Sequence, residues 1–273
     1  MPNNLTVFDA AWLTRAKGAT HGVSWIAGVL DSLNAEGTLY LDSIRIWFNR
    51  FPHPTIKDQG ALKTRLESFN NSDHLGGVNE LSWWEFMRKA QLTATSVATE
   101  TTPRPDFRIS APTEFYVEVS TLNVSIVDCK AFARGEGVYL DHTATLSRIL
   151  LKAANDKRDQ IAYGAGLRQP SVLVLFDYTT WSWQGTQASR VFANALLGTP
   201  RECSRLPVDL SALVYVERKV IDGRIAISRD RSAIYYNPNA TYSLPVGMFP
   251  DIGQFWCQIM ESQPRLDDHW VRL

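Results

Sequence analysis

The chain has few cysteines and no excess charge of either sign. Cys129, Cys203 and Cys257 lie far apart and show no paired spacing, which argues against both a disulfide framework and a zinc site. We therefore expect a reducing, cytoplasmic environment. Lysine and arginine number 28, as do aspartate and glutamate, so the formal net charge is zero. Any surface that binds nucleic acid must then be a local patch.

Long apolar runs and several known motifs are also missing. No stretch approaches the roughly 20 apolar residues that a membrane span needs, and the N-terminus lacks a charged segment followed by an apolar run. We therefore expect a soluble, unprocessed chain with no membrane partner. The five histidines show no mutual spacing for a metal or a catalytic dyad. No nucleophile elbow, Walker motif or Rossmann glycine pattern occurs.

The length and the apolar content allow one substantial core. With 273 residues and 45% hydrophobic content, the chain can bury one core, or one core plus a small lobe. Residues 1–56 hold two apolar patches and end in the breaker Phe51-Pro52-His53-Pro54. We interpret residues 1–56 as an N-terminal helical extension and residues 57–273 as the main domain. The extension has three open roles: a substrate-facing lobe, a contact in a homodimer, or a cover for the core.

Hydrophobic periodicity indicates an α/β domain with a mixed central sheet flanked by helices. Residues 171–177 (SVLVLFD) are almost wholly apolar, as in a strand buried on both faces. The turn at Asp222-Gly223 indicates a hairpin. The expected helices cover residues 61–69, 78–92, 142–163 and 187–197. The expected strands cover residues 93–99, 105–110, 115–122, 171–177 and 210–216.

Two carboxylates lie on neighbouring expected strands. In PRPDFRISAPTEFYVEVS, Asp106 follows a proline, and Glu118 and Ser120 share one face of an alternating strand. Carboxylates brought together across strands repel each other, and a divalent cation would relieve that repulsion and could activate water against a phosphodiester. The alternatives are a turn residue at Asp106 and an exposed edge-strand charge at Glu118.

Four segments, taken in order, carry a resemblance to a known family. They are Asn79-Glu80-Leu81, Pro105-Asp106-Phe107, Glu118-Val119-Ser120 and Lys157-Arg158-Asp159-Gln160. With them, residues 60–250 resemble the PD-(D/E)XK nuclease superfamily, in particular bacterial members with serine or threonine in place of the motif lysine. The late segment Tyr236-Asn237-Pro238-Asn239-Ala240 is similar to a closing segment of such proteins. The resemblance implies a restriction-endonuclease-like fold.

The resemblance also implies a metal site. Asp106 and Glu118 would be the metal ligands, the backbone carbonyl of Val119 would complete the shell, and Glu80 would contribute directly or through water. Mg²⁺ is the expected ion, because it takes a few carboxylates and keeps several waters, and Mn²⁺ is expected to substitute for it. The alternative for Glu80 is a charge near the start of its expected helix, where the helix dipole favours it.

Ser120 departs from the family pattern, because serine cannot supply the cation that the motif lysine offers to developing negative charge. Lys157 and Gln160 interrupt an apolar helical stripe, and the resemblance implies a K-x-x-Q helix as part of the site. The stripe consists of Leu150, Ala153, Ala154, Lys157, Gln160 and Ile161. We expect Lys157 to replace the lysine, and Lys152, off the stripe, is a weaker substitute. The alternatives are a Lys157 that extends to solvent and a Gln160 that caps a neighbouring strand.

These features predict a magnesium-dependent phosphodiesterase, a DNA endonuclease from a bacterial or phage setting. Its catalytic residues would be Asp106, Glu118, Lys157, Gln160 and Glu80. Two other classes stay open. One is a catalytically inactive form of the same fold that binds nucleic acid or serves in assembly. The other is an α/β protein that binds a small anion, although paired carboxylates would repel such a ligand.

Overall fold

The computed structural model describes most of the chain. The described residues are 5–17, 24–31, 35–122, 134, 142–177, 196–197, 204–256, 259–262 and 269–273. All three cysteines lie outside them, as does the expected helix 187–197 except for residues 196–197. In the described part, no helix is both long and apolar enough to cross a membrane.

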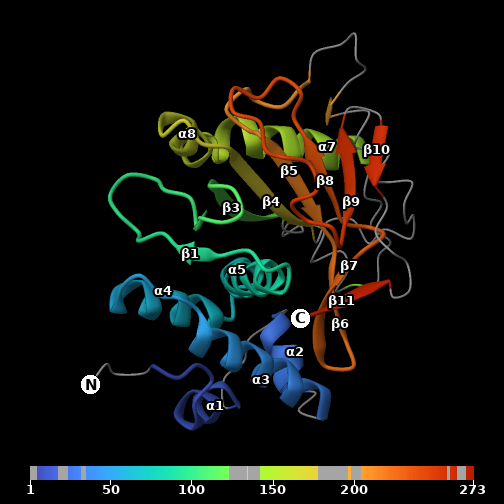
Figure 1. Ribbon diagram of the computed structural model, residues 1–273. Helices are drawn as coiled ribbons and strands as arrows, with labels where there is room; N and C mark the ends of the chain where they lie inside the picture. The colour runs from blue at the N-terminus through green and yellow to red at the C-terminus, as the bar shows by residue number, and fades with distance from the viewer. Residues whose placement is uncertain are drawn as a thin grey trace.

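The centre of the fold is an eight-stranded sheet (Figure 1). In order across the sheet, its strands are β1 (Ala94–Ser96), β2 (Phe107–Ile109), β3 (Phe115–Leu122), β4 (Ser171–Asp177), β5 (Ala212–Val216), β8 (Ala233–Tyr236), β9 (Gly253–Trp256) and β10 (Ile259–Ser262). The pairs β3–β4, β4–β5 and β8–β9 are parallel, and the other neighbours are antiparallel. The predicted α/β class with a mixed central sheet is confirmed.

Two strands have the predicted bounds. β3 covers residues 115–122 and β4 covers residues 171–177. All seven residues of β4 are buried, as expected for a strand covered on both faces. The strands β1 and β2 are shorter than predicted, because the chain between them leaves the sheet and lines a cleft.

Helices cover both faces of the sheet (Figure 1). On one face, α5 (Asn71–Lys89) packs in a large core that is rich in aromatic side chains such as Trp83. The opposite face carries α7 (His142–Leu151) and α8 (Arg158–Gly166), joined by the π-helical turn η1 (Lys152–Asp156), over a smaller core. Successive residues of the central strands therefore face different helices.

The N-terminal helices belong to the larger core. They are α1 (Ala10–Lys17), α2 (Trp25–Asp31), α3 (Ala35–Arg50) and α4 (Ile56–Leu66). Phe8, Trp12 and Phe48 are buried in the same cluster as the side chains of α5. The described part of this region thus contributes to the main core.

The helix α5 begins at Asn71, well before the predicted start at residue 78. Residues 70–77 (NNSDHLGG) separate the two predicted helices and are rich in residues typical of turns, but Asn70 caps the helix by accepting a hydrogen bond from the Ser72 N–H. Gly77 packs against α4, where an added Cβ would lie 3.1 Å from Leu66. The glycine allows two helices to approach each other and does not mark a turn.

A second, three-stranded sheet has the order β11-β7-β6. Its strands are β6 (Arg218–Ile221), β7 (Arg224–Ser228) and β11 (Trp270–Arg272). The predicted hairpin at Asp222-Gly223 is confirmed, and both residues have the positive φ that a two-residue turn of this kind needs. Its tip lies against α3, where a Cβ on Gly223 would be 2.5 Å from the Glu36 carbonyl oxygen.

Candidate active site

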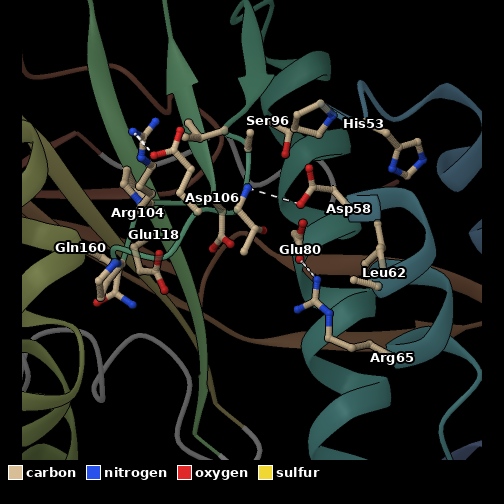
Figure 2. A pocket seen from close by; sticks show the side chains of 18 of the residues that line it. His53, Asp58, Leu62, Arg65, Glu80, Ser96, Arg104, Asp106, Glu118 and Gln160 are labelled. Carbon is tan, nitrogen blue, oxygen red and sulfur yellow. Dashed lines mark hydrogen bonds and ion pairs between the residues drawn. The ribbon is translucent and has the colours of Figure 1, made fainter. Parts of the chain in front are cut away.

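A cleft of about 340 Å³ lies where α4, α5, β3, α8 and the chain segment 96–106 meet. Figure 2 shows side chains from these elements around it. Its charged and amide side chains are Asp58, Arg65, Glu80, Glu100, Arg104, Asp106, Glu118, Lys157 and Gln160. The structure therefore brings together all five side chains that the sequence motifs selected as catalytic.

Asp106 is held at an open edge of β3. β2 begins at Phe107 and pairs with β3 only as far as Val117. Beyond that point the Val119 N–H donates a hydrogen bond of 2.8 Å to Asp106 Oδ2. The carbonyl of Val119 faces the same edge, because the N–H and C=O of one strand residue point to the same neighbour. Asp106 and the Val119 carbonyl, both predicted as metal ligands, thus share one edge of β3.

Glu118 points from β3 toward α8. Leu122, which shares its face of β3, lies in the core beneath α7 and α8. The Glu118 side chain is only 5% exposed and accepts a hydrogen bond of 2.6 Å from Lys157 Nζ. Because Glu118 is buried in a strand between β2 and β4, the alternative of an exposed edge-strand charge is wrong.

Burial and mutual repulsion disfavour ionisation of the two central carboxylates. Burial raises the pKa of Asp106 well above its usual range, and the charges of Glu118 and Glu80 raise it further. Burial also raises the pKa of Glu118, although the Lys157 ammonium acts in the opposite direction. Burial alone would lower the pKa of Lys157, but the charge and hydrogen bond of Glu118 raise it on balance. The site thus favours an added positive charge.

A π-helical turn brings Lys157 to Glu118. The predicted single helix over residues 142–163 is interrupted by η1, and the Lys157 N–H bonds to the Lys152 carbonyl, five residues earlier. Such turns occur often at functional sites. Here the turn exposes Ala154, a member of the predicted apolar stripe, while Lys157 lines the cleft. The alternative of a lysine that extends to solvent is wrong, because Nζ is bonded to Glu118.

Close packing at Gly164 positions α8. Ser171, the first residue of β4, donates a hydrogen bond of 2.7 Å from Oγ to the Ile161 carbonyl. A Cβ on Gly164 would lie 2.3 Å from the same Oγ, so a side chain there would push the helix from the sheet. This contact places Lys157 and Gln160 against β3.

Glu80 reaches the cleft from the middle of α5. Because the helix begins at Asn71, Glu80 is far from its N-terminus, and the alternative of a charge favoured by the helix dipole is wrong. Its Oε2 forms an ion pair with Nη2 of Arg65 on α4. The carboxylate also contributes to the raised pKa of Asp106. Glu80 therefore acts on the site at least through its charge.

Two residues of the family motifs lie away from the cleft. Ser120 is buried on β3 and is not among the described residues that line the cleft. Asn237, from the predicted closing segment, is buried after β8, where its Nδ2 donates hydrogen bonds of 2.9 and 2.8 Å to the carbonyls of Pro207 and Leu210. Asn237 therefore ties two loops together and does not reach the candidate site.

Sequence reasoning missed four charged residues of the cleft, one of which is Glu100, paired with Arg104 at 2.5 Å. Arg65 is paired with Glu80. Asp58 accepts a hydrogen bond of 3.3 Å from the Thr99 N–H. Arg104 lies 5.5 Å from the centre of the Tyr163 ring. Only Arg104, two residues before Asp106, had a motif nearby that could have indicated it.

The cleft carries more negative than positive charge. Five carboxylates and three cations line it, for a net charge of −2 when all are ionised: Asp58, Glu80, Glu100, Asp106 and Glu118 against Arg65, Arg104 and Lys157. One divalent cation would neutralise this excess, and carboxylate and carbonyl oxygens are the ligands that Mg²⁺ takes. Within the described residues, no three acidic, histidine or cysteine side chains gather closely enough to hold a metal as they stand. The groups that could hold such an ion, with water in the remaining positions, are the Asp106 and Glu118 carboxylates and the Val119 carbonyl.

Comparisons with known proteins do not place the chain in a family. No family model matches it, and neither a search of curated proteins nor a search of solved structures finds a match. The interpretation of the cleft therefore depends on its own geometry and chemistry.

Proposed function

We propose that this chain is a magnesium-dependent nuclease with a restriction-endonuclease-like fold and that DNA is its substrate. The observation that carries the proposal is the meeting of Asp106, Glu118 and Lys157 from three separate segments, with Lys157 bonded to Glu118 at 2.6 Å. An acid before one strand and an acid on the next agree with the PD-(D/E)XK pattern, and Lys157, at the start of the following helix, takes the place of the motif lysine. Mn²⁺ is expected to replace Mg²⁺.

The strand residues would hold the ion. Asp106 and Glu118 offer carboxylates, Val119 offers its backbone carbonyl, and Glu80 adds negative charge from α5. The bound ion supplies a water of lowered pKa and offsets charge on the phosphate. The Val119 N–H keeps Asp106 at the edge of β3 through its 2.8 Å hydrogen bond.

Lys157 supplies the cation that Ser120 cannot supply. An ammonium group has three N–H donors, and in the structure one of them bonds to Glu118. With 23% of its side chain exposed, Lys157 can also donate to a phosphate oxygen on which negative charge develops. Gln160, one turn further along α8, lines the same wall and would orient the attacking water. This relocated lysine favours an active enzyme over an inactive binding module.

The proposal is tested by incubating the purified protein with supercoiled plasmid, single-stranded DNA and RNA, with Mg²⁺, Mn²⁺ or a chelator. We expect metal-dependent nicking of DNA that is lost in Glu118→Ala. It should persist in Glu114→Ala, which removes a carboxylate paired with Arg108 outside the cleft. Cleavage of RNA alone would change the substrate class. Absence of both cleavage and metal binding would instead support the inactive nucleic-acid-binding module.

A further inference from the structure

Arg65 is a cation of the cleft to which the sequence motifs assign no role. It lies in the last turn of α4, and its Nη2 donates to Glu80 Oε2 on α5. The side chain is nevertheless 42% exposed. A guanidinium has five N–H donors in a planar fork, so an ion pair through one nitrogen leaves it able to bind a second anion.

The backbone beside Arg65 is firmly held. His74 Nδ1–H donates a hydrogen bond of 2.6 Å to the carbonyl of Leu66, and His74 Nε2 lies 3.0 Å from the Tyr40 hydroxyl, which donates to it. Gly77 lets α5 approach the Leu66 side chain closely. On this support the ion pair with Glu80 orders the guanidinium in advance, so less freedom is lost on binding and affinity is favoured.

Arg65 and Lys157 belong to opposite walls of the cleft. Figure 2 shows Arg65 and Glu80 on one side of Asp106, with Glu118 on the other. Arg65 opposes the rise in the pKa of Asp106, as Lys157 opposes that of Glu118. An anionic strand that enters a cleft with an excess of carboxylates would thus meet at least one anchored cation on each wall, Arg65 on one and Lys157 on the other.

We infer that Arg65 binds a phosphate group of the substrate strand and that Glu80 is the positioning residue that orients its guanidinium. The inference rests on the proposed nuclease function and assigns the contact opposite Lys157. The side of the guanidinium fork away from Glu80 matches two phosphate oxygens, a pairing that lysine cannot reproduce. Glu80 thereby acts through Arg65, in addition to its effect on Asp106.

The inference is tested by measuring the affinity for a fluorescein-labelled DNA duplex at several salt concentrations, with Ca²⁺ in place of Mg²⁺. We expect Arg65→Ala to bind about 10-fold more weakly and to lower the slope of log K against log salt by about one, because one phosphate contact is lost. Arg65→Lys should keep the slope but bind more weakly than the wild type. Glu80→Ala should weaken binding less than Arg65→Ala, and Glu80→Gln less still. Arg224→Ala, at an exposed position of β7, is the matched control and should change neither quantity.

Two results would overturn the inference, and they can be told apart. If Arg65→Ala keeps the affinity and salt slope of the wild type while the wild type cleaves DNA, Arg65 binds no phosphate and the proposed function stands. If the wild type neither binds nor cleaves DNA, the proposed function fails and the inference fails with it. A loss of affinity without a change in slope would also overturn it, because a purely structural role for Arg65 would have that effect.

Discussion

The two walls of the cleft each hold an ion pair, and the pairs differ in depth. In the pair on β3 and α8, the Glu118 side chain is 5% exposed and Lys157 is 23% exposed. In the pair on α5 and α4, the values are 10% for Glu80 and 42% for Arg65. Both carboxylates are buried, but the Arg65 side chain is more exposed than the Lys157 side chain.

The difference in depth separates two kinds of role. Glu118 is on the central sheet, and burial raises its pKa even with Lys157 beside it, so an added cation there would relieve an unfavourable state. Glu80 lies on a helix whose partner cation is open to an incoming ligand. In the proposed nuclease, the Glu118–Lys157 pair would serve the chemistry on the phosphate, whereas the Glu80–Arg65 pair would serve binding of the strand.

The largest loss of activity is expected when the Glu118 carboxylate is neutralised, and neutralising Glu80 should cause a much smaller loss. Glu118→Gln should lower kcat/KM about 1,000-fold or more, because a lost metal ligand removes roughly 4 kcal/mol of transition-state stabilisation. Glu80→Gln should lower it only about 10-fold, or roughly 1.4 kcal/mol. Steady-state cleavage of labelled DNA measures both values. Equal losses would show that the two carboxylates play the same role and would break the comparison.

Removing the Lys157 ammonium should cause the next largest loss of activity. Lys157→Met should lower kcat about 100- to 1,000-fold, because developing charge on the phosphate loses a hydrogen-bond donor. Lys152→Met is the control, since Lys152 pairs with Asp156 at 3.3 Å and does not line the cleft. Single-turnover cleavage would check this. If Lys152→Met were as inactive as Lys157→Met, the assignment of Lys157 would be wrong.

The free energy of unfolding should fall in acid, because of a buried histidine, His74, beside the helix that carries Arg65. Burial lowers the pKa of His74 to about 4, whereas an unfolded histidine titrates near 6.5. The unfolded chain therefore takes up the proton first, so this stabilisation is complete above pH 6.5 and is lost as the pH falls toward 4, in total about 3 kcal/mol. Urea unfolding between pH 7.5 and 4.5 measures it.

The control for this pH dependence is a pair of histidine variants. His74→Gln should unfold more easily at pH 7.5 but lose much of the decline with pH, whereas His269→Gln, at an exposed position, should keep it. A wild-type decline that persists in His74→Gln would exclude His74 as its source.

A smaller effect, on the stability of the fold, is expected from substituting Gly164, which lets α8 pack closely against Ser171 of β4. Gly164→Ala should destabilise the fold by about 1–3 kcal/mol, because its Cβ would overlap Ser171 Oγ. Gly166→Ala, where an added Cβ meets nothing within 4 Å, should be neutral or stabilise by up to about 1 kcal/mol. Thermal unfolding of the two variants compares them. If Gly164→Ala unfolds like Gly166→Ala, close packing does not fix the wall that carries Lys157.

The sheet was more predictable than the helices that border the cleft. The bounds of β3 and β4 follow from alternating and continuous apolar runs, which are local signals. The start of α5 was missed because Gly76-Gly77 resembles a turn, while the close approach of Leu66 to Gly77 depends on a second helix. The π-helical turn before Lys157 was missed because a period of 3.6 was assumed throughout.

The sequence by itself determined which residues could carry chemistry and which strand face Glu118 occupies, because side-chain direction along a strand follows from its period of two. It also indicated Asp106 and Lys157 through their places in an ordered motif. Only the tertiary structure decided which cation neutralises which carboxylate. Lys157 meets Glu118, and Arg65 meets Glu80. Those pairings depend on how separate helices pack against the sheet, and long-range packing leaves no periodic signal in the sequence.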